Sequence, residues 1–281
     1  MGSSGINRLF GWIAILVLGT VAITLSSYSL PLRYGYIGLI FLLLIICRIA
    51  PSLKEYRHVA DAFFIVVLVY FVPLARLVGN VERAGERLFF QIFGRNSLVE
   101  MVAANSMSGI IWWILLPMVV VIIEGDSLKD IFIKIGKRRG WLVGGVVLLA
   151  FVIAGFIVAF MSEIEIGVYL TLLPLAITFA LINSIKEEVL YRGLLFGRTL
   201  RFGFLFALVC QFLWFGLVHM LYSGGQGWGY TGLIMGGAAG VILAWMTKRF
   251  DSLACPILAH MGLDFVLFMA VMIPQFHSQG F

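Results

Sequence analysis

Five ionisable residues lie within or at the ends of long apolar runs in the last third of the chain. They are Glu187, Glu188, His219, His260 and Asp264. Ionisable groups are costly in such segments, so each one is a candidate functional residue. A carboxylate beside an imidazole can activate water as a general base, and a second imidazole or a protonated acid can stabilise an oxyanion. Together these residue types predict hydrolysis of an amide bond in an apolar environment.

The depths of these residues match if their helices form antiparallel pairs. If the helix that carries Glu187 continues to a turn near Gly203, then Glu187 lies 16 residues before the turn and His219 lies 16 residues after it. At 1.5 Å per residue each lies about 24 Å from the turn, so the two side chains can meet. His260 lies nine residues beyond a second turn near Asp251. At about 14 Å from that turn, it reaches the same layer if the first hairpin protrudes by about 10 Å.

The spacing of the charged residues suggests separate roles. His260 and Asp264 are four residues apart and share a helix face, as do Glu188 and Arg192. Two adjacent carboxylates in a low dielectric do not both ionise easily, and Arg192 can neutralise one of them. Because Glu187 and Glu188 point about 100° apart on a helix, we expect them to have different functions.

The composition is that of an integral membrane protein. The 281 residues are 62% hydrophobic before glycine is counted, and only 12% are charged. Soluble domains average about 45–50% apolar residues with glycine included and about 25% charged residues. Apolar runs near the length of about 20 residues that a spanning helix needs fill most of the chain, without the alternating segments of a lipid-facing barrel. We therefore predict an all-α, polytopic transmembrane helical bundle.

Nine segments are candidate spans, so we expect about eight to nine spans, with the catalytic core in the last four. They cover about 9–27, 34–50, 59–78, 104–123, 141–161, 167–190, 203–221, 230–247 and 253–273. Two further stretches, Val81–Glu100 and Ser127–Gly140, are amphipathic and either lie flat at the interface or form solvated loops. We predict N-terminal transmembrane and interfacial helices of unknown role in residues 1–140, and a protease-like core in residues 141–281.

The distribution of basic residues predicts the orientation. With the N-terminus inside, 15 of the 20 Lys and Arg residues lie on the inner side. The positive-inside rule favours this arrangement, which makes the 124–140 loop cytoplasmic. The net charge of +6 is then loop charge, and we expect no nucleic-acid partner. A compact chain without obvious organelle signals leads us to expect a prokaryotic cytoplasmic membrane.

Three motifs resemble those of the CPBP intramembrane proteases, which include the type II CAAX prenyl endopeptidases. The family patterns are EExxxR, FxxxH and HxxxN or HxxxD, and they are matched in order by Glu187-Glu188-Val-Leu-Tyr-Arg192, Phe215-Gly-Leu-Val-His219 and His260-Met-Gly-Leu-Asp264. The resemblance covers about residues 170–270. It implies that Glu187 and His219 activate water, that Glu188 and Arg192 shape and neutralise the site, and that the third motif helps to stabilise the oxyanion. The implied substrate is a membrane-associated protein or peptide, such as a lipidated or C-terminal tail.

Two alternatives stay open: the role of Asp264 in the third motif, and the involvement of a metal ion. Where the family has Asn, its amide can donate a hydrogen bond, and an ionised Asp264 cannot. Asp264 is therefore either protonated, as an apolar site can enforce, or it orients His260. Carboxylates and imidazoles also suit Zn²⁺, with Glu187, His219 and His260 as the ligands. We expect no obligatory metal or cofactor, and a zinc-dependent mechanism is the rival.

Other functions fit the sequence less well. Each polar residue alone has a simpler interpretation, as an interfacial ion pair or a packed histidine, but these interpretations do not explain their common layer. HExxH and GxGD motifs are absent from the sequence, and neither Ser106 nor Ser223 has a GxSG context. A proton-coupled transporter also buries Glu and His, but it usually has inverted repeats and broken helices in both halves. A catalytically silent scaffold or immunity protein is the remaining alternative.

Overall fold

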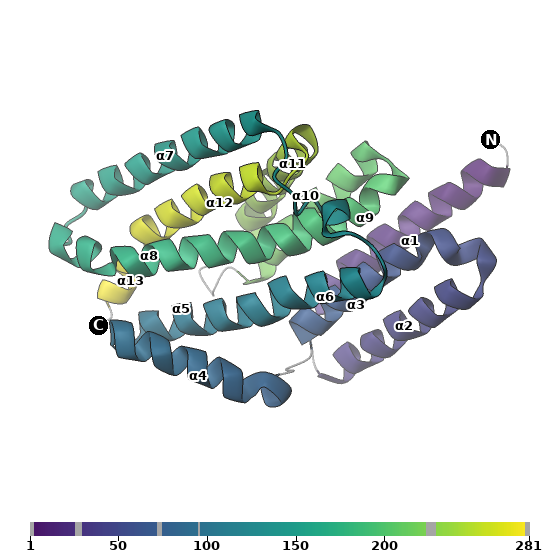
Figure 1. The fold of residues 1–281 in the computed structure, drawn as a ribbon, viewed down its shortest axis with the longest axis horizontal. Helices are drawn as coiled ribbons and strands as arrows, with labels where there is room; N and C mark the ends of the chain where they lie inside the picture. The colour runs from purple at the N-terminus through teal and green to yellow at the C-terminus, as the bar shows by residue number, and fades with distance from the viewer. Residues whose placement is uncertain (1–2, 26–29, 72–74, 95, 223–228, 279–281) are drawn as a thin grey trace. The chain divides into compact units, whose positions relative to one another are not determined.

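The computed structural model describes residues 3–25, 30–71, 75–94, 96–222 and 229–278. These residues form helices and no strand, which confirms the predicted all-α class (Figure 1). The α-helices are α1 (Ser3–Leu25), α2 (Leu30–Ile49), α3 (Arg57–Phe71), α4 (Ala75–Phe93), α5 (Ser97–Ser108), α6 (Leu116–Ile123), α7 (Arg138–Met161), α8 (Ile166–Glu187), α9 (Gly197–Thr199), α10 (Phe204–Tyr222), α11 (Gly229–Phe250), α12 (Ala254–Leu267) and α13 (Ile273–His277). Short 3₁₀ helices cover Pro51–Tyr56, Leu128–Ile131 and Leu200–Phe202, and π-helical segments cover Gly109–Leu115, Glu188–Phe196 and Phe268–Met272.

Local sequence signals explain where several helices begin and end. The Asn96 side chain accepts a hydrogen bond of 2.9 Å from the Val99 amide, which caps the first turn of α5. Gly203 has φ of 123°, a conformation that favours glycine and separates the long helical run before it from α10. Asp251 adopts the left-handed conformation at φ of 57° directly after α11. Both predicted turns are therefore confirmed.

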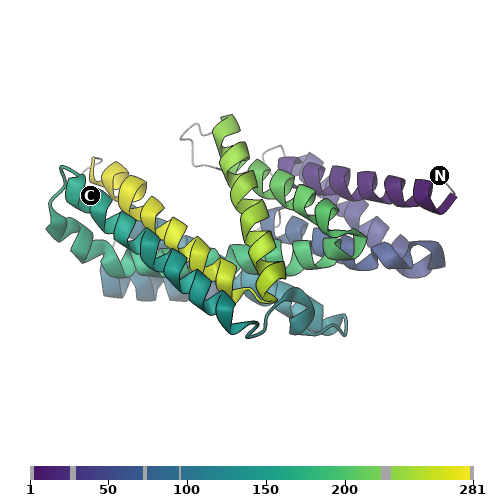
Figure 2. The same ribbon diagram turned by 90° about the horizontal axis from the view of Figure 1, so that it is seen from above.

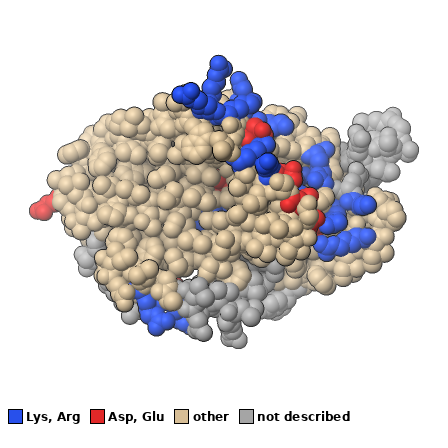
Figure 3. Space-filling view, in the orientation of Figure 1, with Lys and Arg blue, Asp and Glu red and all other residues tan. Residues whose placement is uncertain are grey.

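Within the described residues, six helical runs are long and apolar enough to cross a membrane. They are Ser97–Ile123, Arg138–Met161, Ile166–Phe202, Phe204–Leu221, Gly229–Phe250 and Ala254–His277, and Gly11–Val21 and Gly35–Ile49 are shorter apolar helices. Large apolar side chains such as Val146, Leu149 and Phe160 of α7 are exposed, and most of the face in Figure 3 is uncharged. Such an apolar surface is compatible with the hydrocarbon core of a lipid bilayer. The chain is thus an integral membrane protein, and the total of eight to nine spans stays a prediction.

The two amphipathic stretches adopt different structures. Most of the first belongs to α4, where Phe89 and Phe93 pack against the hydrophobic core. The second contains the 3₁₀ turn Leu128–Ile131 and the first three residues of α7, and the carbonyl of Phe132 accepts a hydrogen bond of 3.1 Å from the Leu253 amide. Ser127–Gly140 is therefore mainly a folded loop, and whether it lies at the membrane interface or in solvent stays a prediction.

The chain divides into two compact units, each described by itself. Unit 1 comprises Met1–Pro73 and Tyr191–Trp245, and unit 2 comprises Leu74–Leu190 and Met246–Phe281. In unit 1, α1 packs against α3 and α10, and the rings of Phe63 and Trp214 meet edge to face at 5.3 Å. Because these units are defined by packing, the predicted boundary at residue 140 stays a prediction.

Unit 2 contains the helices that carry most of the predicted site. Here α12 packs against both α7 and α8, and α7 and α12 run side by side in Figures 1 and 2. The close approach uses small residues, since a Cβ atom at Gly155 of α7 would lie 2.9 Å from the Phe265 ring. On α8, Phe179 packs against Phe268 with ring centroids 5.5 Å apart. This packing fixes α12 beside the end of α8.

Candidate active site

The first motif lies where α8 changes into a π-helical segment. Glu187 is the last residue of α8, and Glu188 begins the segment Glu188–Phe196. Such π-helical turns occur frequently at functional sites. Glu188 is fully buried, whereas the Glu187 side chain is 14% exposed. The predicted difference between the two glutamates is thus already visible in their environments.

His260 lies among three carboxylates within unit 2. Its Nδ1 atom is 2.7 Å from Oε1 of Glu188, which is a direct hydrogen bond. Its Nε2 atom is 3.6 Å from Oε2 of Glu187 and 3.7 Å from Oδ1 of Asp264. The two longer distances exceed that of a direct hydrogen bond and are in the range that a water molecule can bridge. Four of the five predicted residues are therefore brought together.

Asn183 also belongs to this cluster, although sequence reasoning missed it. Its Nδ2 group donates to Oδ2 of Asp264 at 3.0 Å and to Oε1 of Glu187 at 3.3 Å. Asn183 precedes Glu187 by one helical turn, so the two share a face of α8. A polar amide at this spacing inside an apolar run was the signal that could have identified it.

Lys186 is a second residue whose position differs from expectation. The 15 basic residues counted on the inner side include Lys186, Arg192 and Arg198, and all three are buried in helical segments. The Lys186 ammonium donates to Oδ1 of Asn105 in α5. The positive-inside count therefore rests on fewer loop residues than expected, and the orientation stays a prediction.

The remaining predicted residues lie in unit 1, where aromatic stacking holds them. The Arg192 guanidinium lies 3.9 Å from the ring centroid of Phe215, and the rings of Phe215 and His219 are 4.4 Å apart. Nδ1 of His219 is 2.8 Å from the Phe215 carbonyl oxygen. Because a carbonyl can only accept, Nδ1 carries the proton, and Nε2 of a neutral ring is the basic nitrogen.

Glycines of α11 let this helix approach His219 closely. A Cβ atom at Gly236 would lie 2.8 Å from Cβ and Cγ of His219, and one at Gly232 would lie 2.7 Å from its carbonyl oxygen. Likewise, a Cβ atom at Gly237 would lie 2.8 Å from the Phe212 ring. These glycines therefore allow close packing of α11 against α10. Because His219 and Glu187 belong to different units, their pairing stays a prediction.

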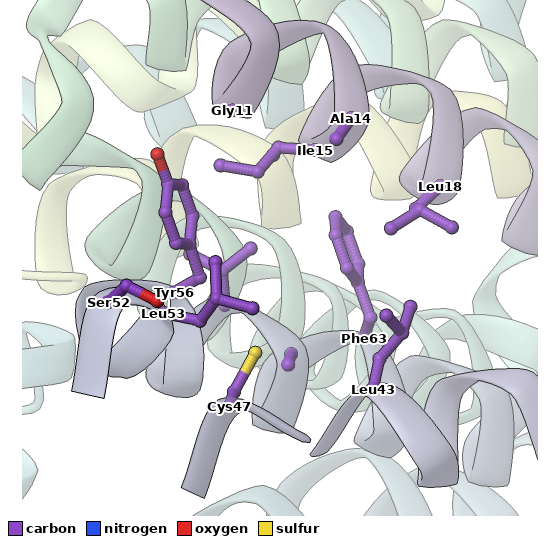
Figure 4. A pocket seen from close by; sticks show the side chains of 12 residues that line it. Gly11, Ala14, Ile15, Leu18, Leu43, Cys47, Ser52, Leu53, Tyr56 and Phe63 are labelled. Carbon is purple, nitrogen blue, oxygen red and sulfur yellow. The ribbon is translucent and has the colours of Figure 1, made fainter. Parts of the chain in front are cut away.

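A cavity of about 520 Å³ in unit 1 is separate from these residues (Figure 4). Side chains of α1, α2, α3 and the segment Pro51–Tyr56 line it, with Cys47, Ser52 and Tyr56 as its more polar members. None of the predicted catalytic residues lines this cavity. Buried acid and base groups are therefore the better guide to the reaction than the size of the cavity.

Residues 169–266 match the model of a family described as Rce1-like, type II CAAX prenyl endopeptidase Rce1-like. The match includes the three motifs from Glu187 to Asp264 and confirms the family resemblance of this region. Comparisons of the chain with curated proteins and with solved structures found no match.

Proposed function

Given that residues 169–266 match a family of CAAX prenyl endopeptidases, we propose that this membrane protein is an intramembrane endopeptidase. It hydrolyses a peptide bond of a membrane-associated protein or peptide, using water activated by a glutamate and a histidine. The observation that carries the proposal is the buried cluster in which Glu187, Glu188 and Asp264 surround His260 at 2.7–3.7 Å. Acid and base groups gathered in this way are typical of catalytic sites.

Glu187 acts as the general base, together with His219. In the proposed step, the water oxygen attacks the peptide carbonyl carbon while one water proton passes to this pair. The C–N bond then breaks as a proton is returned to the leaving nitrogen, so the base becomes the acid. The basic Nε2 of His219 supports its share in this transfer, since its Nδ1 is held by the Phe215 carbonyl. Arg192 shapes and neutralises the site.

Glu188 orients His260 by its 2.7 Å hydrogen bond to Nδ1. A ring fixed in this way presents Nε2 toward Glu187 and Asp264. When that nitrogen carries a proton, it can donate to the oxyanion that forms as water adds to the carbonyl. Asn183 donates to Asp264, so Asp264 serves as an acceptor and acts mainly by orienting its neighbours.

We further propose that the reaction needs no metal ion or other cofactor. One ring nitrogen of His260 is engaged by Glu188, and a carboxylate–imidazole cluster can activate water without a metal. The rival is a zinc site formed by Glu187, His219 and His260. Metal analysis of the purified protein decides between them. One tightly bound Zn²⁺ per chain, removed with activity and restored with it, would overturn the metal-free mechanism.

The proposed substrate is a lipidated segment or C-terminal tail of a membrane-associated protein, and the bilayer is the second partner. The test is a cleavage assay with candidate membrane peptides in bilayer mimics, comparing the wild type with Glu187→Ala. We expect products from the wild type and none from the variant. Equal cleavage by both proteins contradicts the catalytic proposal. No cleavage of any peptide by either one favours the silent scaffold or immunity protein.

We also propose a prokaryotic cytoplasmic membrane with the N-terminus and the 124–140 loop in the cytoplasm. The exposed Ile135 side chain provides a labelling position in this loop, while the three native cysteines are buried. In intact cells, an impermeant maleimide should not label Ile135→Cys, and in opened cells it should. Labelling of intact cells would reverse the orientation.

A further inference from the structure

Lys186 is a buried cation that the proposed reaction does not use. Its side chain packs against the backbone of the segment Gly109–Leu115, since a Cβ atom at Gly109 would lie 2.9 Å from Cδ of Lys186. The ammonium lies 4.9 Å from the Trp113 ring centroid and donates to Oδ1 of Asn105. A buried ammonium is costly unless it is paired and hydrogen-bonded. Lys186 is thus held by specific partners directly beside Glu187.

The contacts of Lys186 impose a direction on two amide side chains. An ammonium can only donate, so Oδ1 of Asn105 faces Lys186 and its NH₂ group points away. That group lies 3.5 Å from Oδ1 of Asn183. The NH₂ group of Asn183 therefore faces the carboxylates of Asp264 and Glu187, at 3.0 and 3.3 Å. In each of these hydrogen bonds, the donor lies on the side of the Lys186 ammonium and the acceptor on the side of the carboxylates.

We propose that Lys186, Asn105 and Asn183 form a positioning relay for the two carboxylates. The inference rests on the proposed function, and none of the three residues touches the reacting atoms. The relay occupies Oε1 of Glu187 with the Asn183 amide, which leaves Oε2 directed toward His260 for the reaction. It also brings a positive charge near a cluster of three carboxylates, where the low dielectric makes charge compensation effective.

The variant Asn105→Asp distinguishes the relay from the simpler hypothesis that Lys186 only needs a hydrogen-bond acceptor. The carboxylate still accepts from the ammonium, but in its ionised form it has no donor for Asn183. If Lys186 only needs an acceptor, this variant behaves like the wild type. If the relay positions Glu187, the variant loses activity as Lys186→Met does. Ser106→Ala is the matched control, because Ser106 is the next residue of α5 and its buried hydroxyl makes no hydrogen bond with the described residues.

The kinetic experiment measures kcat and KM for one membrane peptide with each variant. We expect kcat to fall by up to about 100-fold in Lys186→Met, Asn105→Asp and Asn183→Ala, with KM nearly unchanged, because the reacting groups are displaced while the peptide still binds. Lys186→Gln keeps a donor and retains more activity than Lys186→Met. Ser106→Ala has a normal kcat. Normal kcat in a folded Asn105→Asp variant overturns the relay.

Thermal unfolding in detergent tests the relay without any substrate. Asn105→Ala and Asn183→Ala together should lower the melting temperature by clearly less than the sum of their separate shifts, because either substitution alone already interrupts the relay of hydrogen bonds. Ser106→Ala and Asn183→Ala should add. Additive shifts in the first pair contradict the relay even if no peptide is ever cleaved. A wild type that cleaves no peptide contradicts the proposed function instead, and the unfolding result then decides the relay alone.

Discussion

The predicted site residues of the two units are held by different forces. In unit 2, Glu187, Glu188, His260 and Asp264 are linked by hydrogen bonds and short charge contacts, with Asn183 between two of the carboxylates. In unit 1, the described contacts are mainly aromatic packing: a guanidinium lies over a phenyl ring, that ring packs on an imidazole whose Nδ1 donates to the Phe215 carbonyl, and glycines of α11 approach the histidine.

This difference separates two ways in which a mutation can act. Substitutions in unit 2 should act by changing charges and hydrogen-bond donors, so that even a side chain of the same size as the original should lower the activity strongly. Changes in unit 1 should act through volume and ring geometry, so that an added methyl group is already harmful.

His219→Ala tests whether unit 1 contributes a group to the reaction and not only packing. We expect kcat to fall by about 10²–10⁴-fold, the usual contribution of a general base. Turnover of one membrane peptide gives the effect, and thermal unfolding of the same sample shows whether the variant is folded. A folded His219→Ala protein with near-normal turnover would remove His219 from the proposed mechanism.

Asp264 tests the hydrogen-bond logic of unit 2. In Asp264→Asn, the amide oxygen still accepts from Asn183, so we expect partial activity. Asp264→Ala removes the acceptor and should lower kcat by about 100-fold through misplacement of its neighbours. The check is turnover across pH for the three proteins. An unchanged rate and pH profile in Asp264→Ala would assign Asp264 to packing alone.

Gly236→Ala tests the shape logic of unit 1. The new Cβ atom would lie 2.8 Å from Cβ and Cγ of His219, so the imidazole must move. We expect a loss of kcat of about 10- to 100-fold, since small displacements near a reacting group are costly. Gly38→Ala in α2 is the control, because no atom of the described part of the chain lies within 4 Å of its added Cβ. Equal activity of both variants would contradict the importance of the close approach.

Arg192→Lys keeps the charge but removes the planar group that stacks on Phe215. A buried stacking contact of this kind contributes about 1–2 kcal/mol, so we expect a lower melting temperature and a smaller loss of activity than in the preceding variants. Phe215→Leu should have a similar effect on stability. A melting temperature of Arg192→Lys equal to that of the wild type would show that charge, not stacking, matters there.

The sequence was sufficient for those features that depend on local pattern. Apolar runs predicted the helices, and glycine or aspartate after a run predicted the turns at Gly203 and Asp251. Matched depths along the apolar helices grouped Glu187, Glu188, His260 and Asp264, and the structure brings these four side chains together.

The supporting residues were not predictable in the same way. Asn105 lies in α5, 81 residues before its partner Lys186, and no motif links the two positions. Lys186 was counted among the basic residues on the inner side, because charge alone does not reveal that a third helix supplies a buried acceptor. The position of His219 relative to Glu187 depends on the long-range arrangement of two units, which local periodicity does not determine.

The central claim is that Glu187 activates the water that cleaves the substrate. The most direct measurement is cleavage of one membrane peptide in H₂¹⁸O by the wild type and by Glu187→Gln, with mass spectrometry of the products and thermal unfolding of both proteins. We expect the wild type to place ¹⁸O in the new C-terminal carboxylate, and the folded variant to form no product above background. A folded Glu187→Gln protein with near wild-type turnover would contradict the claim.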